Sequence, residues 1–312
     1  MVLEAMRGRA ARAGNGHKLG KQARIEERYG YLFISPWLLG FLVFGGGPIV
    51  ASIFFSLTAY DIINPARWVG FGNYIGLFRD EMFWISLKAT VTYAVSTVGV
   101  GIVAAFCVAL LLNRNIRGLA FWRTLFYLPS VISGVAVSLL FMWIFQRDFG
   151  LLNQMLWQLL RIKGPGWFSS DEWVIPSLII MSLWGIGGGI IIYLARLQGI
   201  PTELYEAAEI DGAGGLRKLW NITVPLMTPV IFFQLIMGII SSFQVFTVAF
   251  VVTAGRPSYA WLFYVLYLYR NAFEYYKMGY ASAQAWILFL ILIALTITVF
   301  GTAKRWVYYE AE

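Results

Sequence analysis

Six long stretches of this chain contain no aspartate, glutamate, lysine or arginine. They are Tyr31–Tyr60, Ala89–Asn113, Thr124–Gln146, Trp173–Ala195, Leu219–Gly255 and Met278–Ala303. Because a helix rises about 1.5 Å per residue, roughly 20 apolar residues cross a hydrocarbon core about 30 Å thick. Each stretch is long enough, so we predict an all-α integral membrane protein with six transmembrane helices. The composition agrees, since 13% of residues are charged whereas a soluble domain carries about 25%.

The basic residues predict the orientation of these helices. With the N-terminus in the cytoplasm, the inside segments hold fifteen lysines and arginines and the outside segments hold eight, with Lys88 at a boundary left out. Basic residues near helix ends are retained on the cytoplasmic side. We therefore expect a multi-pass membrane protein with both termini in the cytoplasm.

The chain divides into a tail and one domain. We expect residues 1–28 to form a disordered, basic cytoplasmic tail and residues 29–312 to form a single six-helix domain. The tail lacks the apolar stretch and cleavage site of a signal peptide. We interpret its positive charge as holding the N-terminus on the cytoplasmic side of the membrane. Contact with anionic lipid is the alternative role. The net charge of +8 does not indicate nucleic-acid binding, which requires a basic surface on a soluble domain.

Several kinds of chemistry are absent from the sequence. No ionisable residue lies within the six stretches, which argues against ion-coupled carriers and proton pumps. Gly187-Gly188-Gly189 lacks the Lys-Ser or Lys-Thr of a phosphate-binding loop, so we interpret it as a site of close helix packing or pathway lining. The chain has one histidine, His17, and one cysteine, Cys107. Because His17 lies in the tail, the sequence offers no His-bearing zinc site and no buried Ser-His-Asp triad. We therefore expect no enzyme activity and no cofactor bound by this chain.

The loop at about residues 199–228 has a structured pattern. Thr202 after Pro201 predicts a helix start, and glutamates recur every third residue up to Glu209. The glycines from Gly212 predict the end of this helix. A second short helix would follow over Leu216–Thr223 and stop at Pro225. This elbow suits docking into a partner's groove, but periodicity alone does not distinguish docking from a helix lying on lipid headgroups.

The residues of this loop carry a family resemblance. Glu206-Ala207-Ala208, Gly212 and Ile222-Thr223-Val224-Pro225 have the spacing of the Glu-Ala-Ala signature, with Val224 in place of leucine, and Asp211 before Gly212 also fits. The sequence here resembles the membrane permease subunits of binding-protein-dependent ABC importers. Four further motifs, Phe33–Pro36, Gly70–Tyr74, Phe126–Pro129 and Leu197–Pro201, are similar to the carbohydrate-uptake branch and to the larger maltose permease subunit.

The resemblance implies a fold, partners and a mechanism. The fold would be that of a type I importer permease with a cytoplasmic coupling helix. The partners would be a second homologous permease subunit, an ATPase dimer that holds ATP and Mg²⁺, and an extracytoplasmic binding protein that delivers a sugar. The ATPase would dock on Glu206, Ala207, Ala208, Asp211, Gly212, Ile222 and Pro225 and drive alternating access.

Candidates for the sugar pathway are polar or small residues in the apolar stretches. Ser241, Ser242, Phe243 and Gln244 cluster in the fifth stretch, with Gln234 two turns earlier. The resemblance adds Ser130, Gly134 and Gly188 as positions near the pathway. For each residue, interhelical hydrogen bonding or close packing is an equal alternative.

Three functions remain in view. The first is the permease of an ATP-driven sugar importer. The second is a self-sufficient secondary carrier or facilitator for a small polar solute, which would need no ATPase. The third is a membrane enzyme or scaffold, for which the sequence offers no catalytic constellation.

Overall fold

The computed structural model describes residues 21–114, 117–253 and 259–308, and the chain divides into two units, residues 1–54 and 55–312. Residues 1–20 of the expected tail lie outside the described residues. The first helix, α2, begins at Lys21, so residues 21–28, expected in the disordered tail, are helical.

The first unit is one long apolar helix. Its parts are α2 (Lys21–Phe41), the π-helical segment η2 (Leu42–Gly46) and α3 (Gly47–Ser56). Ile25–Ser56 is long and apolar enough to cross a membrane, and none of its most apolar window is buried within the chain. Side chains such as Phe33 and Phe44 are exposed, as befits a helix whose surroundings are lipid tails or another apolar chain.

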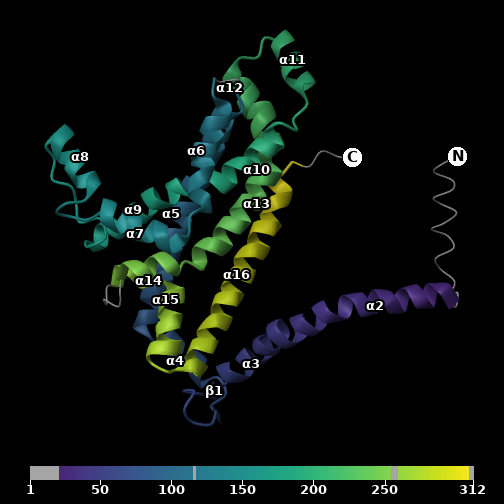
Figure 1. Ribbon diagram of the computed structural model, residues 1–312, viewed down its shortest axis with the longest axis vertical. Helices are drawn as coiled ribbons and strands as arrows, with labels where there is room; N and C mark the ends of the chain where they lie inside the picture. The colour runs from purple at the N-terminus through teal and green to yellow at the C-terminus, as the bar shows by residue number, and fades with distance from the viewer. Residues whose placement is uncertain (1–20, 115–116, 254–258, 309–312) are drawn as a thin grey trace. The chain divides into compact units, whose positions relative to one another are not determined.

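The second unit is almost entirely helical. Figure 1 shows α11 and α12 at one end of this unit and α4 with β1 at the other. Its elements are β1 (Thr58–Ala59), β2 (Arg67–Trp68), α4 (Gly72–Arg79), α5 (Glu81–Leu112), α6 (Leu119–Val131), α7 (Gly134–Ile144), α8 (Leu151–Leu160), α9 (Asp171–Trp184), α10 (Gly187–Leu197), α11 (Thr202–Ile210), α12 (Gly215–Lys218), η3 (Leu219–Thr223), α13 (Val224–Phe243), α14 (Thr247–Thr253), η4 (Tyr259–Trp261), α15 (Tyr264–Tyr269), η5 (Arg270–Glu274) and α16 (Met278–Trp306).

The core of this unit forms around α5, which packs against α9, α10 and α13. One buried cluster, which includes Ala109, Tyr193 and Met227, joins α5, α10 and α13. A second cluster, which includes Phe83, Tyr264 and Leu288, joins α5, α15 and α16. These clusters support the two ends of the unit, and the candidate sites described below are built on them.

All six predicted stretches lie in apolar helices, but two of them are broken. Four helices could each cross a membrane, and the count rises to six if each of two bent pairs forms one span. The pair α6–α7 bends by 100° and the pair α9–α10 by 50°. The first bend follows Pro129 in the last turn of α6, and the second falls at Gly185, residue types that interrupt helices. The prediction of six transmembrane spans therefore stays a prediction, because it requires each bent pair to form one span.

A glycine permits the close packing of α10 on α6. A Cβ atom at Gly187 would lie 2.4 Å from the carbonyl oxygen of Phe126 and 2.9 Å from the Cα of Tyr127. Any larger residue would force the two backbones apart. Gly187 therefore has the close-packing role expected for the glycine triplet, whereas a Cβ atom at Gly188 would have no neighbour within 4 Å.

A small hairpin departs from the expected all-α fold. β1 pairs antiparallel with β2, with Thr58 opposite Trp68. The side-chain amide of Asn73 donates to the carbonyl oxygens of Ser56 and Thr58, each at 2.8 Å. Two residues per strand give no periodicity, so the pattern of apolar residues could not predict this hairpin.

The helix α8 ends at Leu160, and a Gly164-Pro165-Gly166 sequence follows it. Asn153 joins the two parts. Its side-chain amide donates to the carbonyl oxygens of Arg147 at 2.9 Å and Pro165 at 3.2 Å, and its Oδ1 accepts from the indole of Trp167 at 2.7 Å. Because Asn153 is buried, these bonds hold the loop against α8 without leaving its amide unsatisfied.

Candidate functional site

The helix α11 ends in a tight reversal centred on Gly212. The N–H of Ala213 donates to the carbonyl of Ala208 at 2.8 Å, and the N–H of Gly212 to the carbonyl of Glu209 at 3.0 Å. This is the hydrogen-bond pattern of a Schellman C-cap. In this motif the residue that follows the C-cap residue, here Gly212, adopts a left-handed conformation. Gly212 has a φ of 73°, which glycine adopts without a steric penalty. The end of the helix predicted at Gly212 is confirmed.

Two side-chain contacts hold α11 in place. The hydroxyl of Tyr205 lies 2.9 Å from the hydroxyl of Thr223, which is buried in η3. The ammonium group of Lys218 forms an ion pair with Glu209. This hydrogen bond and the positive charge of Lys218 lower the pKa of Glu209. The short helix is thus fixed at both its middle and its end to the segment that precedes α13.

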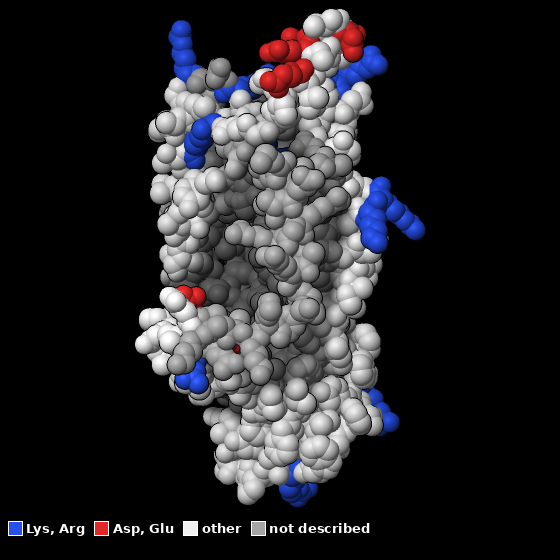
Figure 2. Space-filling view, turned by 90° about the vertical axis from the view of Figure 1, so that its right-hand side faces the viewer, with Lys and Arg blue, Asp and Glu red and all other residues white. Residues whose placement is uncertain are grey.

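The free face of α11 combines acidic and apolar side chains. Glu206, Ala207 and Asp211 are exposed, and Ala208 is half-buried. Figure 2 shows acidic side chains gathered at the end of the unit where α11 lies. Beside them, Ile210 is 88% exposed and Leu216 is 75% exposed. Apolar side chains this exposed outside the hydrophobic stretches are typical of a surface that another protein covers.

The second half of the elbow differs from the prediction. The helix that starts at Gly215 does not stop at Pro225, because α12, η3 and α13 follow one another without a break from Gly215 to Phe243. The π-helical turn η3 ends at Thr223, two residues before Pro225. A wider turn accommodates the proline ring, which would clash with the preceding carbonyl in a regular α-helix. Ile222 and Pro225 are half-buried, and Ile222 packs against the α5–α10–α13 cluster.

A cleft of about 530 Å³ lies beside α5, α9, α10 and α13. The side chains that line it and carry a polar group are Tyr93, Thr97, Ser182, Tyr193, Gln234, Ser241 and Ser242. The hydroxyls of Thr97, Ser182, Ser241 and Ser242 each donate to a carbonyl of their own helix. Each of these hydroxyl oxygens can still accept a hydrogen bond from a molecule in the cleft.

The hydroxyl of Tyr193, which also lines the cleft, is buried and has no hydrogen-bond partner within the described chain. Unsatisfied donors of this kind mark a place where a polar molecule gains hydrogen bonds. The sequence argument missed Thr97, Ser182 and Tyr193; the available signal was a polar residue inside an apolar stretch.

The structure does not bring the predicted pathway residues together. Ser242 lines the cleft, whereas Phe243 is buried in the α5–α15–α16 cluster and Gln244 is exposed. Gly188 is exposed and adjoins the cleft residue Gly189.

The two remaining candidates lie at the α6–α7 bend. The hydroxyl of Ser130 donates to the carbonyl of Tyr127 at 2.7 Å. A Cβ atom at Gly134 would lie 3.7 Å from the side chain of Thr247 on α14. Their role in a pathway stays a prediction.

Polar residues also meet at the end of the unit opposite α11. Asp80, just before α5, accepts hydrogen bonds at Oδ2 from the hydroxyls of Tyr267 and Tyr280, the latter at 2.6 Å. Burial acts to raise the pKa of Asp80, but these hydrogen bonds outweigh it and hold the pKa below its usual value. Burial, together with the bond to Asp80, raises the pKa of Tyr267 to about 12. This network joins α5, α15 and α16.

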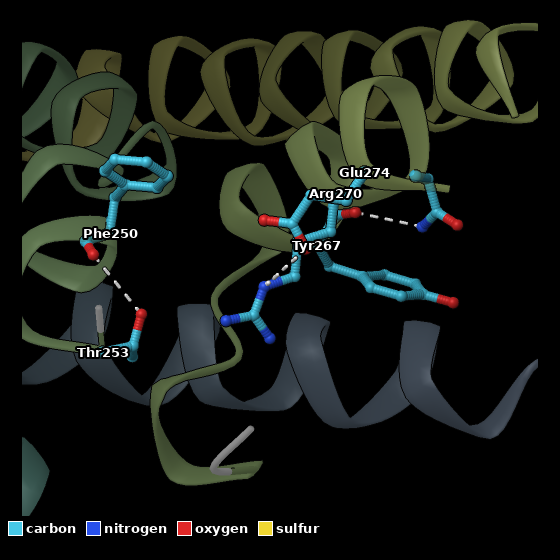
Figure 3. Close-up of polar contacts among 6 residues, drawn as sticks. Phe250, Thr253, Tyr267, Arg270 and Glu274 are labelled. Carbon is cyan, nitrogen blue, oxygen red and sulfur yellow. Dashed lines mark hydrogen bonds and ion pairs between the residues drawn. The ribbon is translucent and has the colours of Figure 1, made fainter. Parts of the chain in front are cut away.

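An arginine lies beside this network. Figure 3 shows Arg270 and Glu274 on the turn that follows α15, with Phe250 and Thr253 of α14 nearby. The Nε atom of Arg270 is 3.7 Å from a carboxylate oxygen of Glu274. Among the described residues, no group of three or more His, Cys, Asp or Glu side chains could hold a metal ion.

Comparison with known families adds to this geometry. Residues 97–307 match the family model described as binding-protein-dependent transport system inner membrane component. The match covers more than half of the chain and includes both the elbow and the cleft.

Individual relatives and a solved structure agree with this match. The probable ABC transporter permease protein YesP of Bacillus subtilis (strain 168) is 40% identical over 306 residues, which cover 96% of this chain and 99% of the relative. The probable starch degradation products transport system permease protein AmyD of Thermoanaerobacterium thermosulfurigenes is 32% identical, with coverage of 88% and 94%. A crystal structure of a bacterial ABC transporter involved in the import of the acidic polysaccharide alginate has a chain of similar fold. Its TM-score is 0.79 at 24% identity, with coverage of 90% and 96%.

Proposed function

The chain belongs to the family of binding-protein-dependent transport system inner membrane components, and on this premise we propose that it is the permease subunit of an ATP-driven importer for a sugar or oligosaccharide. The family makes it a multi-pass membrane protein with the type I ABC permease fold. The sugar class draws support from the relative named for starch degradation products.

The observation that carries the proposal is the elbow at Gly212. It is held rigidly on η3 by Tyr205, and it presents Glu206, Ala207 and the apolar side chain of Ile210 to a partner. We propose that an ATPase subunit docks there, with Asp211 in the same contact. Ile222 and Pro225, which are half-buried, would support this surface from beneath.

The proposed topology places six spans across the bacterial inner membrane, with both termini and the elbow in the cytoplasm. Each bent pair then forms one span. The hairpin, α4, α8 and the turn after α15 face the outside, where an extracytoplasmic binding protein would deliver the sugar. Residues 29–312 act as one permease domain that pairs with a second homologous permease subunit. ATP and Mg²⁺ would bind to the ATPase dimer.

The proposed pathway uses the cleft between α5 and α13. Gln234, Ser242 and the hydroxyl of Tyr193 offer hydrogen bonds, and the apolar walls suit the non-polar faces of a sugar ring. Ser130, Gly134, Gly188, Phe243 and Gln244 would flank the route and move as the two bent spans rearrange.

Reconstitution tests this function. The chain is co-expressed with the second permease, ATPase and binding protein encoded beside it, purified and placed in liposomes. We expect a stoichiometric ATPase in the purified complex and sugar uptake that needs ATP and the binding protein. Uptake by this chain alone, with no associated ATPase, would instead establish the rival function of a self-sufficient carrier.

A further inference from the structure

Arg123, in the second turn of α6, is a cation whose donors the described chain leaves mostly unused. Its Nη2 atom donates to the carbonyl of Leu112 at 3.4 Å, which is longer than the usual range of about 2.7–3.2 Å. Its Nε atom is buried and has no hydrogen-bond partner among the described residues. No carboxylate of the described chain forms an ion pair with it. A guanidinium has five N–H donors and stays charged at physiological pH, so its capacity to bind an anion is largely free.

This side chain can be reached from a cavity of about 240 Å³ between α5, α6 and α10. Arg123 lines the cavity and is half-buried, so the protein does not enclose its charge. Thr124 and Tyr127 of the same helix add hydroxyl groups to the lining. Most of the remaining wall is apolar and includes Leu112 of α5 and Ile191 of α10. The cavity thus combines a single cation with a largely hydrocarbon surface.

The cavity lies toward the end of the unit that carries the elbow. Leu112 is the last residue of α5, and α6 and α10 lie below α11 and α12 in Figure 1. Under the proposed topology this is the level of the cytoplasmic leaflet. The turn from α5 to α6 adds Arg114 and Arg117 and contains no acidic residue. Trp122, beside Arg123, is exposed, and tryptophan is enriched where a membrane meets water.

These features select an amphipathic anion as the ligand. A guanidinium binds a phosphate through charge-assisted hydrogen bonds that are often bidentate. Apolar walls suit acyl chains, whereas a soluble anion gains nothing from them. Basic pockets between helices on the cytoplasmic side are a type of site that binds lipid headgroups. A second protein chain would have to place a carboxylate at the same depth of the membrane, which is costly.

We propose that this cavity binds an anionic phospholipid of the cytoplasmic leaflet, with the lipid phosphate on Arg123 and the acyl chains on the apolar side chains around it. Leu125 and Ile191, both exposed, extend the apolar surface available to those chains. The bound lipid joins the ends of three helices near the elbow and stabilises the folded protein, because it binds the folded state alone. The site goes beyond the proposed transport function and does not depend on the cargo.

Lipids of different charge test the proposal. The full-length permease is purified with its partners in an uncharged detergent. Native mass spectrometry counts retained lipids, and thermal midpoints are recorded with dioleoylphosphatidylglycerol, dioleoylphosphatidylcholine or inorganic phosphate. We expect phosphatidylglycerol to be retained and to raise the midpoint most, since phosphatidylcholine carries its own cation and inorganic phosphate has no acyl chains. An equal rise with phosphatidylcholine would overturn the selection for an anion. An equal rise with inorganic phosphate would show a site for a soluble anion and would overturn the proposal.

Variants then assign the binding to the residue. Arg123→Gln should weaken binding of phosphatidylglycerol by about tenfold or more, the effect of losing a charge-assisted hydrogen bond. Arg123→Lys keeps the charge without the planar fork and should retain part of the binding. Arg305→Gln is the matched control, because it removes an exposed arginine from the last turn of α16, on the same proposed side of the membrane. It should leave the binding unchanged.

Two results would assign Arg123 another role. If the midpoint of Arg123→Gln falls but phosphatidylglycerol still raises it by the wild-type amount, the residue supports the protein structure alone. If lipid retention is unchanged while the second permease is lost from the purified complex, the cavity is a protein interface. Either result would overturn the proposal and leave the transport function in place.

Discussion

The hydroxyl of Tyr205 lies 2.9 Å from the hydroxyl of Thr223, across eighteen residues of chain. Tyr205 is in the middle of α11, and Thr223 is the last residue of η3, directly before α13. Because η3 continues into α13, a force applied to α11 passes through this contact into a long helix of the membrane domain. The contact is therefore a mechanical link between the proposed docking surface and the pathway.

Removing this hydrogen bond should weaken coupling more than assembly. Tyr205→Phe deletes the hydroxyl and keeps the ring, so we expect a loss of about 1 kcal/mol in the attachment of α11. ATP hydrolysis by the complex should persist while sugar uptake per ATP falls. Tyr275→Phe removes an exposed hydroxyl at the other end of the unit and is the control. Unchanged uptake per ATP in Tyr205→Phe would contradict the link.

The left-handed turn at Gly212 predicts a strong effect of substitution. Gly212→Val places a β-branched residue at a φ of 73°, a conformation that costs an L-residue about 1–2 kcal/mol. The Schellman cap should open, and ATPase co-purification and uptake should both fall. Gly214→Val is the control, because Gly214 has an extended backbone and open space around it. Equal behaviour of the two variants would argue against the role of the turn.

Charge at the docking surface gives a separate test. Glu206→Lys reverses an exposed charge on α11 without touching its cap or its anchor. We expect normal membrane insertion, weaker ATPase association and loss of uptake. Pull-down of the ATPase by detergent-solubilised permease measures the association directly. Full association in this variant would place the docking surface elsewhere.

Two neighbouring glycines provide a matched pair for packing. Gly187→Ala would put a Cβ atom 2.4 Å from the Phe126 carbonyl, whereas Gly188→Ala would meet nothing within 4 Å. Overpacking of this kind costs about 1–3 kcal/mol. The thermal midpoint of the purified permease should fall in Gly187→Ala and stay near the wild-type value in Gly188→Ala. The reverse order would contradict the close contact between α10 and α6.

The hydrogen bonds to Asp80 predict that the thermal stability of the protein depends on pH. Although burial opposes ionisation, the hydroxyls of Tyr267 and Tyr280 keep the pKa of Asp80 below its ordinary value of 3.8. The stabilisation is therefore complete above this ordinary value and is lost as the pH falls through the lower folded-state pKa. Thermal midpoints measured from about pH 6 down to about pH 3 should fall less steeply in Asp80→Asn than in the wild type. Parallel curves would exclude this source of stability.

Much of the fold could be predicted because membrane insertion depends on local composition. The six apolar stretches and the helix from Thr202 both follow from runs of neighbouring residues. The 100° bend between α6 and α7 could not be predicted, since a proline such as Pro129 also occurs in helices that continue beyond it. After the bend α7 packs against α14, which is distant in the chain.

The position of the elbow could be predicted from the sequence, whereas that of the cleft could not. The spacing from Glu206 to Pro225 marked the elbow because a short helix, a glycine turn and a return helix are local. The cleft draws Thr97, Ser182 and Gln234 from three helices, and no local pattern relates them.

The sequence by itself determined that this chain is an apolar, multi-helix membrane protein with a structured loop around Gly212, because charge-free length and turn chemistry act over a few neighbouring residues. The tertiary structure decided which polar groups are left without partners. Tyr193 in the cleft is an ordinary residue in the sequence. It becomes part of a candidate site only because helices distant in the chain bury its hydroxyl and, among the described residues, supply no hydrogen-bond partner for it.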